Sequence, residues 1–197
     1  MTLCCYSTLS GTIGASYAAV GRGVPGIAFS ASSVSRDYTT LNFEDSKDES
    51  IQIATYTANI VSSLADLRDD GKKVLPLGLG ANVNFAQNVG IKDKCHKAKF
   101  YHTRLTGGAL TDKVVINATS GLPTYQDLVG PGLNVCLNGD CSLPGETNVI
   151  KKDDCSATIS IYSVDYDAPT SALKYAKPNV DKAVARLNSK KSHRGHY

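Results

Sequence analysis

The chain has 197 residues, of which 42% are hydrophobic, and a formal net charge of +3 at pH 7. This length and composition are typical of one globular domain with a sizeable core, and they exclude a disordered or fibrous protein. The small charge, with no basic stripe interleaved with aromatic residues, gives no indication of nucleic acid as a partner. No apolar run approaches the length of a membrane span, so we expect no membrane partner.

The stretch LSGTIGASYAAV at residues 9–20 predicts a helix whose start suits an anion. Ser10 is a good N-cap residue, Gly11 lets a ligand approach the backbone closely, and Thr12 adds a hydroxyl donor. Helix N-termini expose unpaired N–H groups and carry a partial positive charge. We therefore interpret these three residues as a candidate anion-binding group.

The rest of this helix predicts how it packs and where it ends. Gly21 and Gly23 are expected to end it, and residues 26–30 read as a buried strand that follows. A face of small residues predicts close packing of the helix on a sheet, and its members are Gly14, Ala15, Ala18 and Ala19.

The acidic run EDSKDE at residues 44–49 is interpreted as a solvated helix start rather than a metal site, because acids are favoured in the first turn of a helix. Apolar residues then recur at helical spacing from Ile53 to Leu67. The pair Asp69 and Asp70 follows this helix, and we do not assign it to a metal.

The stretch ANVNF at residues 81–85 predicts a strand in which Asn82 and Asn84 satisfy neighbouring backbone groups. His96 and His102 lie on an expected loop or strand with no carboxylate at ligand spacing. We therefore predict no metal site at these histidines.

The stretch CLNGDC at residues 136–141 predicts a disulfide between Cys136 and Cys141, because an Asn-Gly turn brings the two cysteines opposite each other. Whether Cys95 and Cys155 form a second pair is left open, since a sequence does not fix disulfide connectivity. Asn117 begins an N-glycosylation sequon. Disulfides and a sequon together suit an oxidising compartment, and free thiols with an unused sequon are the alternative.

The last third of the chain begins with residues 120–150, which prolines and glycines break into loops and short hairpins. Residues 156–164 alternate between polar and apolar side chains, which predicts a strand with one buried face. A final helix is expected to begin at Pro178 or Asn179. Residues 188–197 are expected to form a disordered basic tail.

Residues 9–20, together with GVPGIAFS at residues 23–30, resemble the core of the SurE family, the survival-protein E phosphatases and nucleotidases, in its fungal branch. The stretch at residues 81–85 is similar to the family's NVNFP strand, and ATISIY at residues 157–162 is similar to its last core strand. The resemblance implies a three-layer, Rossmann-like α/β fold over residues 1–187. This fold would carry a β-hairpin arm and a C-terminal helix.

The resemblance implies a metal-dependent phosphomonoesterase, either an acid phosphatase or a nucleotidase, with Mg or Mn as its cofactor. Its partner would be a small phosphate ester or nucleoside monophosphate, bound by Ser10, Gly11 and Thr12. The family places paired aspartates, a metal-binding serine and an asparagine before this block, whereas only nine residues precede it here and none fits. We therefore expect a domain that is incomplete at its N-terminus, inactive, without catalytic residues or metal ligands.

The alternative hypothesis is a non-catalytic remnant that serves as a phosphate-binding or interaction module. The resemblance also implies secretion for a full-length member, although the first nine residues do not read as a signal peptide. It further implies a homodimer formed by exchange of C-terminal elements after Pro169.

Overall fold

A computed structural model gives the fold, and it describes residues 10–31, 37–67, 75–91, 94–95, 97–105, 112–127, 136, 140–164 and 166–189. Helices and strands alternate in the first half of the described chain, and a hairpin interrupts the second half. In chain order the elements are α1 (Gly11–Gly21), β1 (Gly26–Ala31), the 3-10 helix η2 (Tyr38–Thr40), α2 (Glu49–Ala65), β2 (Leu79–Phe85), β3 (Lys99–Thr103), β4 (Asp112–Ile116), β5 (Pro123–Asp127), α3 (Glu146–Lys152), β6 (Ser156–Ser163), β7 (Tyr166–Asp167) and α4 (Thr170–Ser189).

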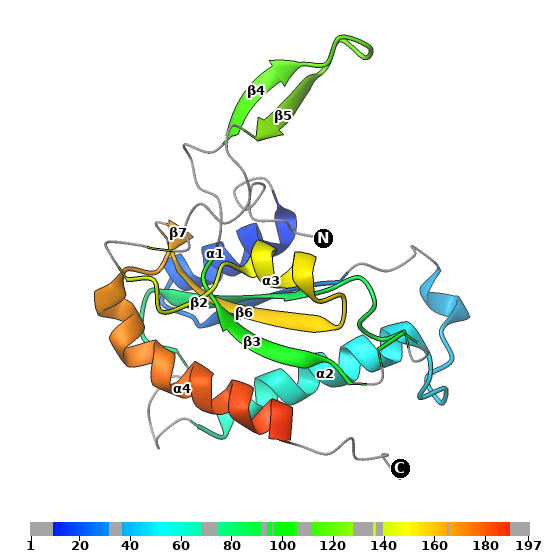
Figure 1. Ribbon diagram of the computed structural model, residues 1–197, viewed down its shortest axis with the longest axis vertical. Coiled ribbons are helices and arrows are strands. Elements are labelled where there is room, and N and C mark those ends of the chain that lie inside the picture. The colour runs from blue at the N-terminus through cyan, green and yellow to red at the C-terminus, as the bar shows by residue number, and fades with distance from the viewer. Residues whose placement is uncertain are drawn as a thin grey trace.

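The main sheet has the strand order β1-β2-β6-β3, and the short β7 pairs with β6. β1 runs parallel to β2, and β3 runs parallel to β6, whereas β2 and β6 are antiparallel to each other. Helices α1 and α3 lie on one face of this sheet, and α2 and α4 lie on the other (Figure 1). The three-layer α/β architecture expected from the sequence is therefore confirmed.

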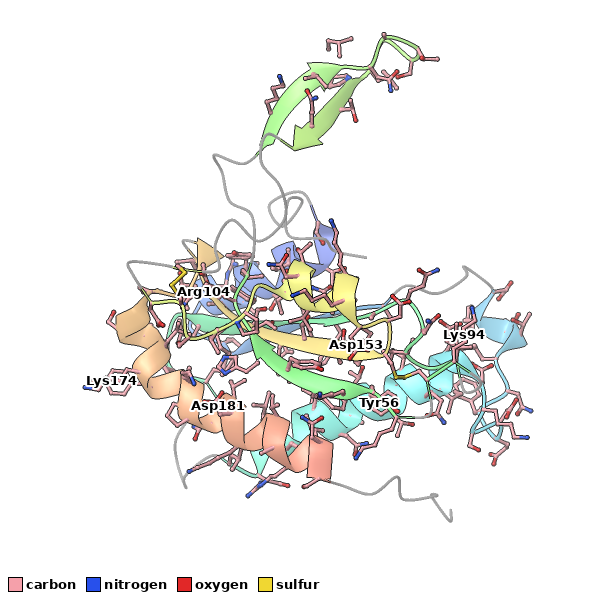
Figure 2. The ribbon with its side chains drawn as sticks, viewed as in Figure 1. Tyr56, Lys94, Arg104, Asp153, Lys174 and Asp181 are labelled. Carbon is pink, nitrogen blue, oxygen red and sulfur yellow. A yellow bond between two sulfur atoms is a disulfide. The ribbon has the colours of Figure 1, made fainter. Side chains whose placement is uncertain are left out.

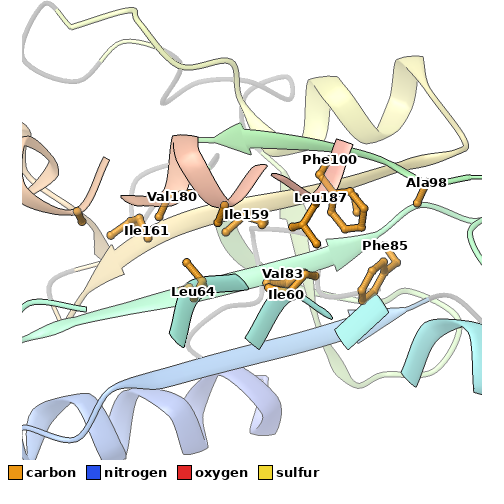
Figure 3. Close-up of a cluster of buried hydrophobic side chains, with 14 of the residues drawn as sticks. Ile60, Leu64, Val83, Phe85, Ala98, Phe100, Ile159, Ile161, Val180 and Leu187 are labelled. Carbon is orange, nitrogen blue, oxygen red and sulfur yellow. The ribbon is translucent and has the colours of Figure 1, made fainter. Parts of the chain in front are cut away.

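The hydrophobic core fills the space between the sheet and the helices α2 and α4 (Figure 3). Every second residue of β2, from Leu79 to Phe85, contributes to it, because successive side chains of a strand point to opposite faces. Ile159 and Ile161 of β6 complete the sheet side. The helices contribute a buried stripe of apolar residues, among them Ile60, Leu64, Leu173, Ala176, Val180, Ala183 and Leu187.

All eight residues of β6 are buried, so the prediction of a strand with one buried face is wrong. β6 lies at the centre of the sheet, and helices cover both faces of the sheet. Its polar residues Thr158 and Ser160 are therefore buried beneath the helices α1 and α3 rather than exposed. In β6 the alternation of polar and apolar residues distinguishes two buried faces, one more polar than the other, rather than a buried face and an exposed face.

Helix α1 packs on the sheet through Ile13, Ser16 and Val20, which are buried, so the predicted packing face of small residues is wrong. Ala15 and Ala18 are exposed instead. The close approach comes from a glycine of the strand: a Cβ on Gly26 would lie 2.5 Å from Ser16 Oγ and 2.8 Å from its carbonyl oxygen. The sheet, rather than the helix, supplies the small residue.

Helix α4 begins at Thr170 and continues through Pro178, so the prediction of a start at Pro178 or Asn179 is wrong. Pro169 opens the helix, since its carbonyl accepts from Ala172 and Leu173. Proline normally disrupts a helix interior, but the buried apolar stripe on both sides of Pro178 keeps α4 on the sheet. None of the helices in the described part is long and apolar enough to span a bilayer.

The C-terminal end of α4 covers the edge of β3. Asn188 accepts a hydrogen bond from the N–H of Phe100 and donates one to its carbonyl, at 2.8 and 2.9 Å. This pair replaces the contacts that a further strand would make, which protects an edge strand from non-native pairing. Helix α4 therefore continues to Ser189, while residues 190–197 lie outside the described residues. The domain boundary at residue 187 stays a prediction. The homodimer through C-terminal elements stays a prediction.

The strands β4 and β5 form a separate two-stranded sheet that projects from the body, which agrees with the expected hairpin arm (Figure 1). Asn117 is exposed in the connection between them. The end of the range 120–150, all of which was expected to form loops and short hairpins, instead forms most of α3 (Glu146–Lys152) on the body of the molecule.

Two disulfides are present among the described residues. Cys136 and Cys141 are joined, with Cα atoms 4.2 Å apart, which confirms that prediction. Their expected Asn-Gly turn, residues 137–139, lies outside the described residues. Cys95 and Cys155 form the second disulfide, with Cα atoms 5.4 Å apart. The sequence alone did not decide whether these two cysteines pair. This bridge joins the segment before β3 to the start of β6.

Gly80 of β2 provides the first testable prediction. A Cβ at this position would overlap the ring of Tyr162, a fully buried side chain of β6. We expect Gly80→Ala to lower the free energy of unfolding by about 2 kcal/mol, because overpacking a dense core costs energy. Denaturant unfolding measures the change.

Gly14→Ala is the matched control, because a Cβ there meets nothing within 4 Å and alanine favours a helix. Its free energy of unfolding should stay constant or rise by up to about 1 kcal/mol. Equal stability of the two variants would contradict this account of Gly80.

Candidate functional site

The start of α1 is the candidate binding group, and its N-cap residue is Ser10. Ser10 has extended backbone angles, and its carbonyl accepts the first helical hydrogen bond from Gly14 at 2.9 Å. Its hydroxyl makes no capping hydrogen bond. The first N–H groups of a helix have no intrahelical acceptor, and within the described residues the Ser10 hydroxyl caps none of them.

The two residues after the cap are both exposed, and they are Gly11 and Thr12. A Cβ built on Gly11 meets nothing within 4 Å, so the backbone there faces open space. The first turn of α1 contains no acidic residue. Because no carboxylate from this turn competes for the N–H groups, an anion finds the helix dipole uncompensated.

The position of α1 is fixed by Tyr162 of β6. The Tyr162 hydroxyl donates to Ser16 Oγ, and its ring lies against the ring of Tyr17, with 4.6 Å between ring centroids. The Tyr162 ring also lies where a side chain on Gly80 would be. These contacts place the helix rigidly on the sheet, while Gly11 and Thr12 at its start stay exposed.

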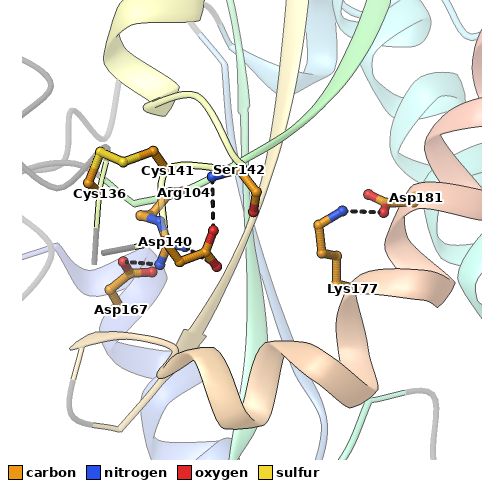
Figure 4. Close-up of polar contacts among 8 residues, drawn as sticks. All are labelled: Arg104, Cys136, Asp140, Cys141, Ser142, Asp167, Lys177 and Asp181. Atoms are coloured by element: carbon orange, nitrogen blue, oxygen red, sulfur yellow. Dashed lines mark hydrogen bonds and ion pairs between the residues drawn. A yellow bond between two sulfur atoms is a disulfide. The ribbon is translucent and has the colours of Figure 1, made fainter. Parts of the chain in front are cut away.

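A second polar cluster surrounds Arg104, which follows β3 and is fully buried (Figure 4). Its guanidinium contacts the carboxylates of Asp167 at 3.1 Å and Asp140 at 3.4 Å. Asp140 lies in the segment closed by the disulfide Cys136–Cys141. The cluster therefore joins the end of β3, the disulfide segment and β7.

Burial raises the pKa of Asp167 to about 6, although Arg104 acts in the opposite direction. The pKa of Asp140 is lowered, first by a hydrogen bond to its carboxylate from Ser142 and to a lesser extent by Arg104. The two acids that share one arginine therefore titrate differently. Both are engaged with the guanidinium, and neither is free to hold a metal ion.

His102 of β3 is buried, and its Nδ1 lies 2.5 Å from the carboxylate of Asp181. Asp181 lies on α4 (Figure 2). Asp181 also contacts Lys177 at 2.6 Å. Burial lowers the pKa of His102, so the ring is neutral and Nδ1 donates to the carboxylate. His102 is therefore a buried hydrogen-bond partner of Asp181. The expectation of no metal site at the histidines stays a prediction, and His96 lies outside the described residues.

The acidic run at residues 44–49 behaves as predicted. Asp48 is the N-cap of α2 and accepts from Ser50 and Ile51, and Glu49 lies in the first turn. Asp69 and Asp70 lie outside the described residues. Among the residues that the structure does describe, no group of three or more His, Cys, Asp or Glu side chains could hold a metal ion.

Asn82 and Asn84 are buried as expected, but their amide groups do not serve the backbone. Both donate to one oxygen of Glu146, at 3.3 and 3.5 Å. The prediction of a backbone partner is wrong because Glu146 lies more than sixty residues away in sequence, and no local pattern points to it. Pro144 and Gly145, directly before Glu146, predict a turn and give no indication of a buried glutamate.

Comparisons with known proteins show the family to which the chain belongs. A model of the family described as "Survival protein SurE" matches residues 3–138, more than half of the chain. The chain belongs to the SurE family. The expected resemblance is therefore confirmed.

A relative of this chain is an acid phosphatase from Yarrowia lipolytica, 43% identical over 165 residues. The match covers 82% of this chain but 46% of the relative, so the chain spans less than half of that protein's length. A crystal structure of the SurE protein from Aquifex aeolicus is similar with a TM-score of 0.41 and 16% identity. That match covers 88% of this chain and 58% of the other.

The Arg104 cluster provides a prediction about stability. Arg104→Met leaves Asp167 buried without its cation, and we expect the free energy of unfolding to fall by about 3 kcal/mol. The double variant Arg104→Met with Asp167→Asn removes the unpaired carboxylate and should recover part of this loss. Chemical denaturation at pH 7.5 measures both. A double variant that is no more stable than the single one would contradict an ion-pair role.

Proposed function

We propose that this SurE chain binds the phosphate group of a small phosphate ester or nucleoside monophosphate at the start of α1. The observation that carries the proposal is the exposed start of this helix at Gly11 and Thr12, in a first turn that contains no acidic residue. Gly11 faces open space, and the Ser10 hydroxyl makes no capping bond. Kinship with an acid phosphatase supports a phosphate ester as the ligand class.

In this proposal the N–H groups of the first turn and the hydroxyls of Ser10 and Thr12 donate to the phosphate oxygens. The helix dipole adds a favourable term for the negative charge. Binding needs no lysine or arginine, because several short N–H and O–H donors converge on one anion at a helix start. The fixed position of α1 on Tyr162 keeps these donors in place before the ligand arrives.

The family is metal-dependent, so a divalent ion such as Mg or Mn is the cofactor to consider. The described residues do not fit it: Asp167 pairs with Arg104, Oε2 of Glu146 accepts from Asn82 and Asn84, and no group of three or more His, Cys, Asp or Glu side chains among them could hold a metal ion. We therefore derive no hydrolytic step from them. We infer that the chain binds phosphate without hydrolysing esters by itself, as a non-catalytic phosphate-binding module.

The test compares two glycine substitutions in the same helix. Gly11→Ala adds a methyl group that meets no protein atom, so the fold should not suffer, but the methyl would stand where phosphate approaches. We expect inorganic phosphate to raise the melting temperature of the wild type, and the affinity derived from that rise to fall about tenfold in Gly11→Ala. Gly14→Ala, equally open but one turn further in, should keep the wild-type affinity.

A phosphate response that is equal in the two variants would reject the helix start as the binding site. Hydrolysis of p-nitrophenyl phosphate with Mg²⁺ or Mn²⁺ is measured on the same preparations, and we expect none. Metal-dependent hydrolysis that disappears in Thr12→Ala would overturn the inference of inactivity and leave phosphate binding standing.

We also propose that the protein works outside the cytosol and carries a glycan on Asn117. The two disulfides favour an oxidising compartment, where Asn-x-Ser/Thr sequons are modified. Asn117 is exposed, and its side-chain oxygen accepts from the N–H groups of Thr119 and Ser120 in a tight turn. Exposed Ile116 and Leu122 flank this turn, and a glycan would shield them from water.

The sequon is tested by secreting the chain from a eukaryotic host behind a cleavable leader. N-glycosidase should shift the mobility of the wild type and of Thr119→Ser, because serine preserves the sequon. No shift is expected for Asn117→Gln or Thr119→Ala. A wild-type chain that is secreted without a glycan would contradict the assignment.

A further inference from the structure

The face of the sheet beneath α1 and α3 carries a buried polar layer. Asn82 and Asn84 of β2 and Thr158 and Ser160 of β6 all point to this face, opposite the hydrophobic core. None of the four is more than 2% exposed. Thr103 of β3 extends the layer, since its hydroxyl lies 2.7 Å from that of Ser160. Groups buried in this way require hydrogen-bond partners.

Glu146, the first residue of α3, places its carboxyl group in this layer and is 1% exposed. One oxygen, Oε2, takes all the donors: Ser160 at 2.9 Å, Asn82 at 3.3 Å and Asn84 at 3.5 Å. The other oxygen, Oε1, has no partner among the described residues, and neither has the side-chain oxygen of Asn84. Two buried acceptors therefore lack a donor in the same layer.

No cation in the described part of the chain pairs with Glu146. Arg104 is adjacent, since its carbonyl accepts from the Glu146 N–H at 3.0 Å. Its guanidinium, however, is directed at Asp140 and Asp167. A fully buried carboxylate without a cation is unfavourable, and such a group takes up a proton instead.

We propose that Glu146 is a proton-binding site that locks α3 onto the sheet, with the proton on Oε1 as the donor that the layer lacks. The protonated acid is uncharged, so it is stable where it lies. After ionisation the buried charge is compensated only by the three donors on Oε2. The segment between Gly145 and Cys155 then loosens, while the backbone bridge at Arg104 and the Cys95–Cys155 disulfide retain its two ends.

The direction of the pH effect follows from the shift of the pKa. Burial raises the pKa of Glu146 to about 7 from an ordinary 4.5, and the charge of Asp167 acts in the same direction. The folded state therefore binds this proton more tightly than the unfolded chain. Its stabilising effect is complete below about pH 4.5 and is lost as the pH rises through 7.

Other groups near the layer titrate as well. Asp167 of β7, whose pKa is raised to about 6 by burial, contributes in the same direction at lower pH. His102 of β3, whose pKa burial lowers, contributes in the opposite direction, because the unfolded chain binds its proton more tightly. Arg104 is the cation of the neighbouring cluster, and the pKa of Asp140 is lowered, first by a hydrogen bond from Ser142. A difference between two variants is therefore needed to isolate Glu146.

The experiment compares the wild type with Glu146→Gln, which imitates the protonated acid in size and neutrality. Melting temperatures are measured between pH 4.5 and 8.5. We expect the wild type to lose on the order of 5 °C relative to Glu146→Gln between pH 5 and pH 8. The matched control is Asp167→Asn, whose difference from the wild type should change at lower pH. If the melting temperatures of the wild type and of Glu146→Gln change in parallel over the whole pH range, the proposal is overturned.

Hydrogen exchange of the wild type gives an answer that needs no variant. The amide of Val149, which donates to Gly145 within α3, should lose protection by about tenfold or more from pH 5.5 to 8 after correction for intrinsic exchange. The amide of Val180, on the buried face of α4, should not. Equal changes at the two amides would mean that α3 has no local response, and would overturn the lock.

Discussion

The antiparallel pairing of β2 with β6 is the interaction on which the other layers depend. Its register places Val83 opposite Ile159 on one face and Asn82 opposite Ser160 on the other. One strand pair therefore creates two different interiors. The apolar face receives α2 and α4 and supplies most of the hydrophobic stabilisation. The polar face receives α1 and α3, where hydrogen bonds and close backbone contacts decide how the helices sit. A shift of one residue would exchange the two faces.

Glycine and tyrosine together determine how α1 reaches this polar face. Gly26 permits contact with the backbone of Ser16, and Gly80 leaves room for the Tyr162 ring that holds the same residue. The helix is thus attached by its middle, and its first turn extends to the surface with exposed N–H groups. An anion site formed in this way depends on where the helix begins rather than on the net charge of the chain, which is only +3. The mild charge and the proposed phosphate ligand are therefore compatible.

Local patterns in the sequence predicted what local chemistry controls. Ser10 and Gly11 open a helix, Asp48 caps another, and the short Cys136–Cys141 spacing closes a disulfide, because each feature involves only a few neighbouring residues. The failures involve distant contacts. Glu146 accepts a hydrogen bond from Asn82, 64 residues away in the sequence, and no periodic pattern of residues predicts such a contact. Similarly, α4 passes through Pro178 because the sheet holds its apolar face, which overrides the local preference of proline.

Arg104 and Glu146 show two ways in which one fold buries a charged side chain. Their backbones are bonded to each other, yet the arginine is matched by two acids from later segments, whereas the glutamate is matched only by neutral donors. In the first arrangement both carboxylates have the guanidinium as a charged partner. The second contains Glu146, whose pKa is raised by burial from 4.5 to about 7, so the charge of this group depends on pH under mildly acidic to neutral conditions. A cation beside Glu146 would have made this layer insensitive to pH. Because the described residues provide no such cation, the stability of α3 depends on the pH of the solution as well as on the sequence.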